Sequence, residues 1–72
     1  MTVVYKLVNK FTDDTSMSSW VRIALNGILE NVLIISEDYY IERYLSEDYL
    51  FYIHIKNGGL TKVCVYRKEN EQ

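Results

Sequence analysis

Cysteine, glycine and long apolar segments are all scarce in this chain, and each scarcity excludes a class of protein. The one cysteine, Cys64, cannot supply a disulfide framework and lacks the spaced partners of a structural zinc site. The longest apolar runs, residues 32–35 and 49–53, fall far short of the roughly 20 residues that a transmembrane helix needs. The three glycines form no phosphate-binding loop, and no nucleophile elbow is visible. The sequence therefore predicts a protein that is not an enzyme, uses no cofactor or metal and does not enter a membrane.

The short length predicts one domain, residues 1–72, with a small core. A chain of this size buries only about 60% of the surface that its unfolded form exposes, so its stability is marginal without a disulfide, a metal or a partner. Hydrophobic residues nevertheless make up 49% of the sequence, and seven residues are tyrosines. We therefore expect part of the apolar surface to be covered by a second copy in a homodimer.

The cysteine content, the N-terminal sequence and the net charge bear on the compartment of the protein and on its binding partners. The lone cysteine, and the lack of a basic N-terminal region followed by a long apolar segment, predict a cytoplasmic protein that is not secreted. A net charge of −2 argues against nonspecific binding of a phosphate backbone, which needs a concentrated basic face. This net charge does not exclude a local cluster of basic residues.

Residues 49–68 contain the clearest structural signal, a β-hairpin around Asn57, Gly58 and Gly59. A two-residue loop would set Ile53 opposite Lys62 and mix charge into the apolar face. A three-residue loop with a bulged turn gives one clean apolar face, and a one-residue slip would exchange the two faces. We therefore predict the register of the three-residue loop, with Ile55 opposite Thr61. Its core residues are Phe51, Ile53, Ile55, Val63 and Val65.

The rest of the chain suggests one helix and further strands. Residues 17–30 have helical spacing of apolar side chains, and Asp13 and Asp14 suit the start of that helix. Gly27 would allow another backbone to approach closely; a rival reading makes Asn26 and Gly27 a hairpin turn. Residues 2–11 are ambiguous, and their valines favour a strand.

A five-residue sequence occurs twice in nearly the same form in the second half of the chain. SEDYY at 36–40 recurs as SEDYL at 46–50, which predicts a meander of strands at 32–35, 39–45, 49–56 and 60–68. A helix over 37–45 is the alternative. The predicted fold class is α+β, with one main helix packed on a small, mostly antiparallel sheet of three to four strands.

His54 and Cys64 are the one pair that could suggest catalysis. In the predicted register His54 faces Lys62, and Cys64 is its diagonal neighbour on the same face. Diagonal positions lie roughly 7–8 Å apart at Cα, and no third orienting group is evident in the sequence. We therefore interpret Cys64 as a small buried residue and His54 as a half-exposed strand residue.

Two surfaces could bind partners. Tyrosines suit protein interfaces because a rigid apolar ring carries a polar tip. The tyrosines that we predict to form an interface are Tyr39, Tyr40, Tyr44, Tyr49 and Tyr52. The alternative function is a nucleic-acid-associated regulatory protein with a basic hairpin face. That face would consist of Lys56, Lys62, Arg67 and Lys68.

The order WVRIALNGILENVLIIS, SEDYY, SEDYL and the NGG hairpin resembles the YopT family of hypothetical proteins from Bacillus and its prophages, which is distinct from the effector protease of that name. The resemblance implies a homodimer of subunits with one helix and three strands, with residues 32–45 as a merged element. It carries no functional residue to any position. The first function hypothesis is therefore a non-catalytic interaction protein, encoded by a prophage and acting on a host protein.

Overall fold

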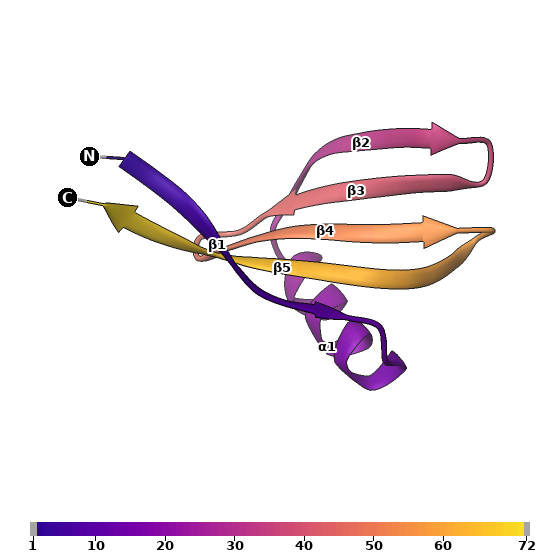
Figure 1. Cartoon of the computed structure of the whole chain (residues 1–72), viewed down its shortest axis with the longest axis horizontal. Coiled ribbons are helices and arrows are strands. Elements are labelled where there is room, and N and C mark those ends of the chain that lie inside the picture. The colour runs from indigo at the N-terminus through magenta and orange to yellow at the C-terminus, as the bar shows by residue number, and fades with distance from the viewer. Residues whose placement is uncertain (1, 72) are drawn as a thin grey trace.

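Five strands form one antiparallel sheet, and a single helix lies on one of its faces (Figure 1). The computed structural model describes residues 2–71. The elements are β1 (Thr2–Phe11), α1 (Asp14–Ala24), β2 (Ile28–Ser36), β3 (Tyr39–Leu45), β4 (Tyr49–Lys56) and β5 (Gly59–Glu71). Across the sheet the strands follow the order β1-β5-β4-β3-β2, so β1 and β2 are its two edges. Strands β2 to β5 are the predicted meander, and β1 extends it beside β5.

The predicted α+β class with three to four strands is wrong, because the protein is mostly β and its sheet has five strands. Two features of the chain account for the difference. Residues 2–11 form the strand that their valines favour, and by pairing with the edge of the long strand β5 they add a fifth strand to the four of the meander. Residues 32–45 are not a merged element, since a turn at Glu37 and Asp38 separates β2 from β3. The three strands that the family resemblance implied are therefore too few.

Helix α1 begins where its sequence provides a cap. Asp13 has extended backbone angles (φ −86°, ψ 142°), and its carboxylate accepts a hydrogen bond of 2.8 Å from the Ser16 N–H. That bond is the main reason why the pKa of Asp13 lies below its usual value. Asp14 follows in the first turn, where negative charge complements the helix dipole. The helix thus begins three residues before Met17, where the predicted apolar spacing starts, and the prediction that Asp13 and Asp14 lie at its start is confirmed.

The predicted end of the helix at residue 30 is wrong, because α1 stops at Ala24. Gly27 explains the early end: a Cβ atom there would lie 2.5 Å from the carbonyl oxygen of Leu45. The prediction that Gly27 allows close approach of another backbone is confirmed. The hairpin turn at Asn26 and Gly27 does not form, since the chain passes from helix to strand there. Ile28, predicted for the apolar helix arc, is instead the first residue of β2.

The β4–β5 hairpin combines the two turns that the sequence left in competition. Asn57 (φ 54°) and Gly58 (φ 75°) form a two-residue loop with Lys56 opposite Gly59, so the predicted three-residue loop is wrong. An extra residue, Thr61, then bulges out, so Ile55 lies opposite Leu60. The bulge restores the predicted register beyond it. The observed pairs there are Phe51 with Val65, Ile53 with Val63, Tyr52 with Cys64, and His54 with Lys62.

The core lies between α1 and the middle of the sheet. Met17 and Ala24 are the buried residues of the helix, and Trp20 packs against the same cluster. The buried strand residues of the cluster are Tyr44, Phe51, Ile53, Val63 and Val65. The predicted core is therefore confirmed for four residues, while Ile55 is half-buried beside the turn. We call this side of the sheet the helix face and the other side the open face.

The sheet leaves the molecule elongated, with extents of 42 × 25 × 19 Å. Its accessible surface is 5097 Å², whereas a compact chain of its mass, 8.5 kDa, would expose about 4,700 Å². The excess is expected of a two-layer fold in which the helix covers part of one face. The open face has no second layer within the described residues 2–71.

Candidate functional site

A shallow apolar groove runs over the open face. Its larger hollow has a volume of about 390 Å³ and adjoins a second of about 190 Å³. The two hollows share Leu33, Ile41 and Tyr52. The other residues of the larger hollow are Tyr5, Leu50, His54, Cys64 and Tyr66. All five strands contribute, because alternate residues of each strand point to this face.

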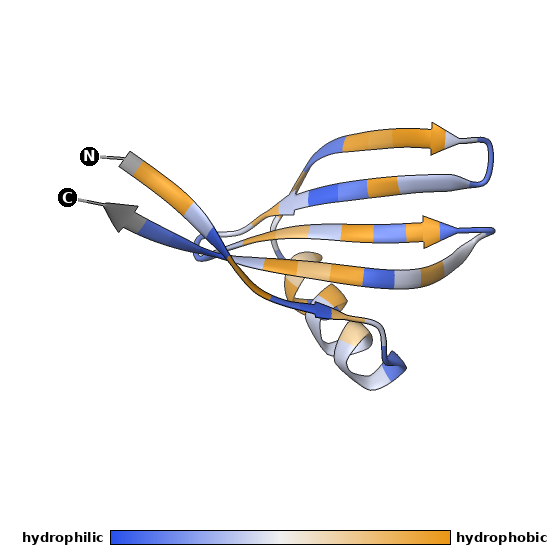
Figure 2. Ribbon diagram, viewed as in Figure 1, coloured by the Kyte–Doolittle hydropathy of each residue, from blue (hydrophilic) through white to orange (hydrophobic). Residues whose placement is uncertain are grey.

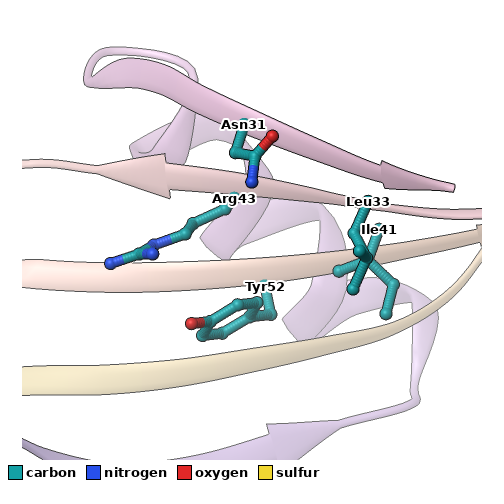
Figure 3. Close-up of a pocket in the computed structure, with 5 residues that line it drawn as sticks. All are labelled: Asn31, Leu33, Ile41, Arg43 and Tyr52. Atoms are coloured by element: carbon teal, nitrogen blue, oxygen red, sulfur yellow. The ribbon is translucent and has the colours of Figure 1, made fainter.

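Arg43 marks the part of the groove nearest β2 (Figure 3). Its guanidinium carbon lies 5.9 Å from the ring centroid of Tyr52. Its Nε lies 3.5 Å from a carboxylate oxygen of Glu30, which comes from the bulge in β2. This Nε is buried and makes no hydrogen bond, so the contact with Glu30 leaves its donor capacity unused. The Arg43 side chain as a whole is 42% exposed and lines the smaller hollow, so its positive charge lies at the groove.

Tyr39, His54 and Cys64 form a short polar chain beside the groove. The Tyr39 hydroxyl lies 2.7 Å from His54 Nδ1, and Cys64 Sγ lies 3.9 Å from His54 Nε2. The sequence did not reveal Tyr39 as the group that orients His54, because the two residues are fifteen positions apart. Cys64 is only 6% exposed, as expected of a small buried residue.

The environment of His54 favours its neutral form. Partial burial, and then the charge of Lys62 opposite, lower the pKa of His54 below its usual 6.5. A thiolate nucleophile is normally stabilised by an adjacent imidazolium, which a histidine with a lowered pKa does not provide at neutral pH. The arrangement therefore favours hydrogen bonding that fixes the open face over thiol chemistry.

The lowered pKa of His54 predicts a pH dependence of stability. Below pH 6.5 the unfolded chain takes up a proton at this imidazole before the folded chain does, so falling pH favours unfolding. This contribution is complete above pH 6.5 and is lost below it. Urea unfolding between about pH 8 and pH 5 should therefore show a steeper decline for the wild type than for His54→Gln. Parallel declines in the two proteins would contradict this prediction.

The five predicted interface tyrosines do not share one surface. Tyr44 is buried in the core, and Tyr49 packs against Trp20 and Phe51 on the helix face. Tyr40 lies opposite Ile55 and so also belongs to the helix face. Tyr39 and Tyr52 lie on the open face, where Tyr5 and Tyr66 join them. The period-two alternation of residues 39–45 and 62–68 was the available signal for this division.

The basic residues divide in the same way. Lys56, Lys62 and Lys68 lie on the open face, whereas Arg67 lies opposite Lys6 on the helix face. The register also brings Lys10 and Arg43 to the open face, beside Cys64 and Tyr52 respectively. The sequence could not reveal Lys10 there, because a bulge in β1 between Leu7 and Asn9 shifts its side chain to that face.

Within residues 2–71 no three His, Cys, Asp or Glu side chains come together as metal ligands, and no helix has the length and apolar character needed to cross a membrane. Comparison with known proteins finds no matching family model, no similar curated protein and no similar solved structure. The resemblance to the YopT family therefore stays a prediction.

Proposed function

We propose that this protein is a non-catalytic interaction protein that acts as a homodimer, with strand β2 pairing antiparallel to β2 of a second copy. The observation that carries the proposal is the exposure of β2, in which all nine residues are exposed. Six of them are aliphatic, with exposed fractions from 42% for Val32 to 74% for Ile34. Figure 2 shows a hydrophilic section in the first half of this strand, followed by a continuous hydrophobic stretch toward its end.

The two edges of the sheet differ in how they are protected. Edge strands usually carry charges or prolines that prevent pairing with other chains. The edge strand β1 carries Lys6 and Lys10, whereas the one charged side chain of β2, Glu30, is engaged with Arg43. Strand β2 therefore has the character of an interface strand.

A second copy paired with β2 would cover its exposed side chains on both faces of the sheet and its free backbone groups. Val32 and Ile34 point to the helix face and Leu33 to the open face, so an object docked on one face would leave the other exposed. A strand added at the edge pairs the free backbone groups and places aliphatic side chains beside it on both faces. About a two-fold axis through β2, each copy meets its own sequence in this way.

The exposed length of β2 sets the surface that pairing can bury. A standard interface takes about 800 Å² from each partner, about one sixth of the 5097 Å² exposed here. The nine residues of β2 are one eighth of the 72-residue chain, and all of them are exposed and available for pairing. Regular pairing would be centred on residues 31–34, between the irregularities at either end of the strand.

Val32→Lys should convert the dimer to a monomer. The new ammonium groups would lie in the pairing region, and we expect the dissociation constant to rise by at least about tenfold, or ~1.4 kcal/mol. In a monomer the lysine would lie beside Glu42, its partner in β3, so the fold should tolerate it. Sedimentation velocity at micromolar concentration measures the change.

Val8→Lys is the matched control. Val8 is 47% exposed and Val32 is 42% exposed, but Val8 lies on the opposite edge strand. This variant should remain dimeric. A wild-type monomer at micromolar concentration would contradict the homodimer, and a dimer that Val32→Lys leaves intact would contradict the β2 interface.

The proposal also includes a cytoplasmic location and a prophage-encoded role on a host protein. A pull-down with the tagged protein tests the role on a host protein.

A further inference from the structure

The open face concentrates the positive charge of an acidic protein. The chain has eight basic and ten acidic residues, yet the strand positions of the open face hold five of the basic ones. These are Lys10, Arg43, Lys56, Lys62 and Lys68. Among the side chains that the structure describes, Glu30 is the one carboxylate in contact with this set, through Arg43.

The other acidic side chains that the structure describes lie elsewhere. Glu42 and Glu69 belong to the helix face, where Glu69 pairs with Lys6 at 3.2 Å. Four more lie in the turns after β2 and β3, and two lie at the start of α1: Glu37, Asp38, Glu47, Asp48, Asp13 and Asp14. The net charge of −2 therefore conceals a basic open face, because the acidic residues lie mainly in the turns and at the start of α1.

Aromatic side chains alternate with these cations along the face. Residues directly opposite one another on neighbouring strands form ranks across the sheet, and successive ranks are roughly 6.7 Å apart. From the hairpin turns toward the termini the ranks contain Tyr39 with Lys56, His54 with Lys62, Arg43 and Tyr52 with Cys64 and Lys10, Leu50 and Tyr66 with Leu7, and Tyr5 with Lys68. Every rank thus holds an aromatic ring, and four of the five hold a cation.

Direct contacts couple the two kinds of side chain. Lys56 Nζ lies 6.0 Å from the Tyr39 ring centroid, and the Arg43 guanidinium lies 5.9 Å from that of Tyr52. Between the ranks lies the apolar groove of about 390 Å³, with Leu33, Ile41 and Leu50 in its wall. A flat apolar group can therefore enter the groove while the anion attached to it meets a cation at the rim.

We propose that the open face binds single-stranded nucleic acid, with bases stacked on the tyrosines and phosphates held by the five basic side chains. Unpaired bases stack on aromatic side chains of sheet surfaces, and a basic groove follows their backbone. A duplex hides its bases, and its grooves are entered by a helix or a two-stranded ribbon, which this broad face does not provide. An acidic peptide would satisfy the cations and leave the regular series of rings without a role.

Salt dependence of binding tests the proposal quantitatively. The probe is a fluorescein-labelled oligothymidylate of about 15 nucleotides, followed by anisotropy. Five phosphate contacts predict a slope of log K against log salt concentration of about −3.5 per chain, a loss of roughly hundredfold between about 50 and 200 mM salt. Lys56→Gln combined with Lys62→Gln should reduce the slope to about −2. A duplex of the same length should bind more weakly.

Two matched controls separate the open face from general charge and from misfolding. Lys6→Gln with Arg67→Gln removes the same charge from the helix face and should leave the slope at its wild-type value. Tyr52→Leu should weaken binding by about five- to hundredfold, whereas Tyr52→Phe keeps the ring and should bind nearly as the wild type does. Circular dichroism establishes that each variant is folded.

Three results would overturn the proposal: no binding at about 50 mM salt, equal losses in the two double variants, or displacement of the oligonucleotide by polyglutamate at equal charge. The last result would identify a general polyanion surface instead.

The β2 dimer is tested separately, because Val32→Lys should keep the wild-type slope per chain even as a monomer. In the dimer the two open faces lie on the same side of one continuous sheet, so longer oligonucleotides should bind more tightly to the wild type than to this variant.

Discussion

Phe51→Ala should lower the free energy of unfolding of this protein by about 3–5 kcal/mol. Phe51 is fully buried (0% exposed) and contacts rings from both layers, with centroids 6.2 Å from Trp20 and 5.8 Å from Tyr49. Removing a buried phenylalanine ring costs about 3–5 kcal/mol. A 72-residue chain has a free energy of unfolding of about 4–11 kcal/mol in total. The loss is therefore at least about a quarter of the stability of the domain, and all of it at the lower end of that range.

Urea unfolding followed by tryptophan fluorescence measures this effect, because the single tryptophan, Trp20, packs directly against the Phe51 ring. Ile34→Ala is the control, since Ile34 is 74% exposed in β2 and its truncation removes little buried surface in a monomer. Its free energy of unfolding should stay within about 0.5 kcal/mol of the wild type at concentrations where the chain is monomeric. Similar losses in the two variants would mean that the core does not lie where the structure places it.

Gly27→Ala should destabilise the protein by about 1–3 kcal/mol through steric overlap. The new Cβ would lie 2.5 Å from the carbonyl oxygen of Leu45, 3.0 Å from the carbonyl carbon and 3.2 Å from the Ala24 oxygen. All three are backbone atoms, so a side-chain rotation cannot relieve the overlap. Either the end of α1 or the end of β3 must move, and the first residues of β2 move with them.

Gly59→Ala is the matched substitution. The nearest atom to its new Cβ is the Lys56 carbonyl oxygen at 3.6 Å, an ordinary contact, so the free energy of unfolding should change by less than about 0.5 kcal/mol. Thermal unfolding followed by circular dichroism compares the two variants. Equal midpoints for them would show that the approach of Gly27 to Leu45 is not a constraint on the fold.

The core register of the hairpin could be predicted from the sequence because it depends on local alternation. Phe51 and Val65, and Ile53 and Val63, can share a buried face in one alignment only, whichever turn connects the strands. The turn itself was predicted wrongly, since Asn57 and Gly58 form the two-residue loop that they favour and Thr61 absorbs the extra residue. A bulge depends on both strands together, and the sequence of one strand does not reveal it.

The pairing of residues 2–11 with the sheet and the end of the helix could not be predicted, because both depend on contacts between distant segments. Residues 25–30 have helical spacing, but Gly27 must pass against Leu45, which directs the following residues into β2. Residues 2–11 pair with the edge of β5, more than fifty residues later. Neither fact is encoded in the local periodicity of the segments concerned.

The residue types of the candidate site could be predicted from the sequence, whereas their arrangement could not. The sequence by itself determined the composition: a small chain with excess apolar surface, many tyrosines, one histidine, one cysteine and a net charge of −2. Only the tertiary structure decided how these residues are divided between two faces. It buries Tyr44 in the core and brings Lys10, Arg43 and Lys68 to one surface from three different strands. Net charge is a sum over the chain, whereas binding depends on where each charge lies, and strand pairing alone sets that position.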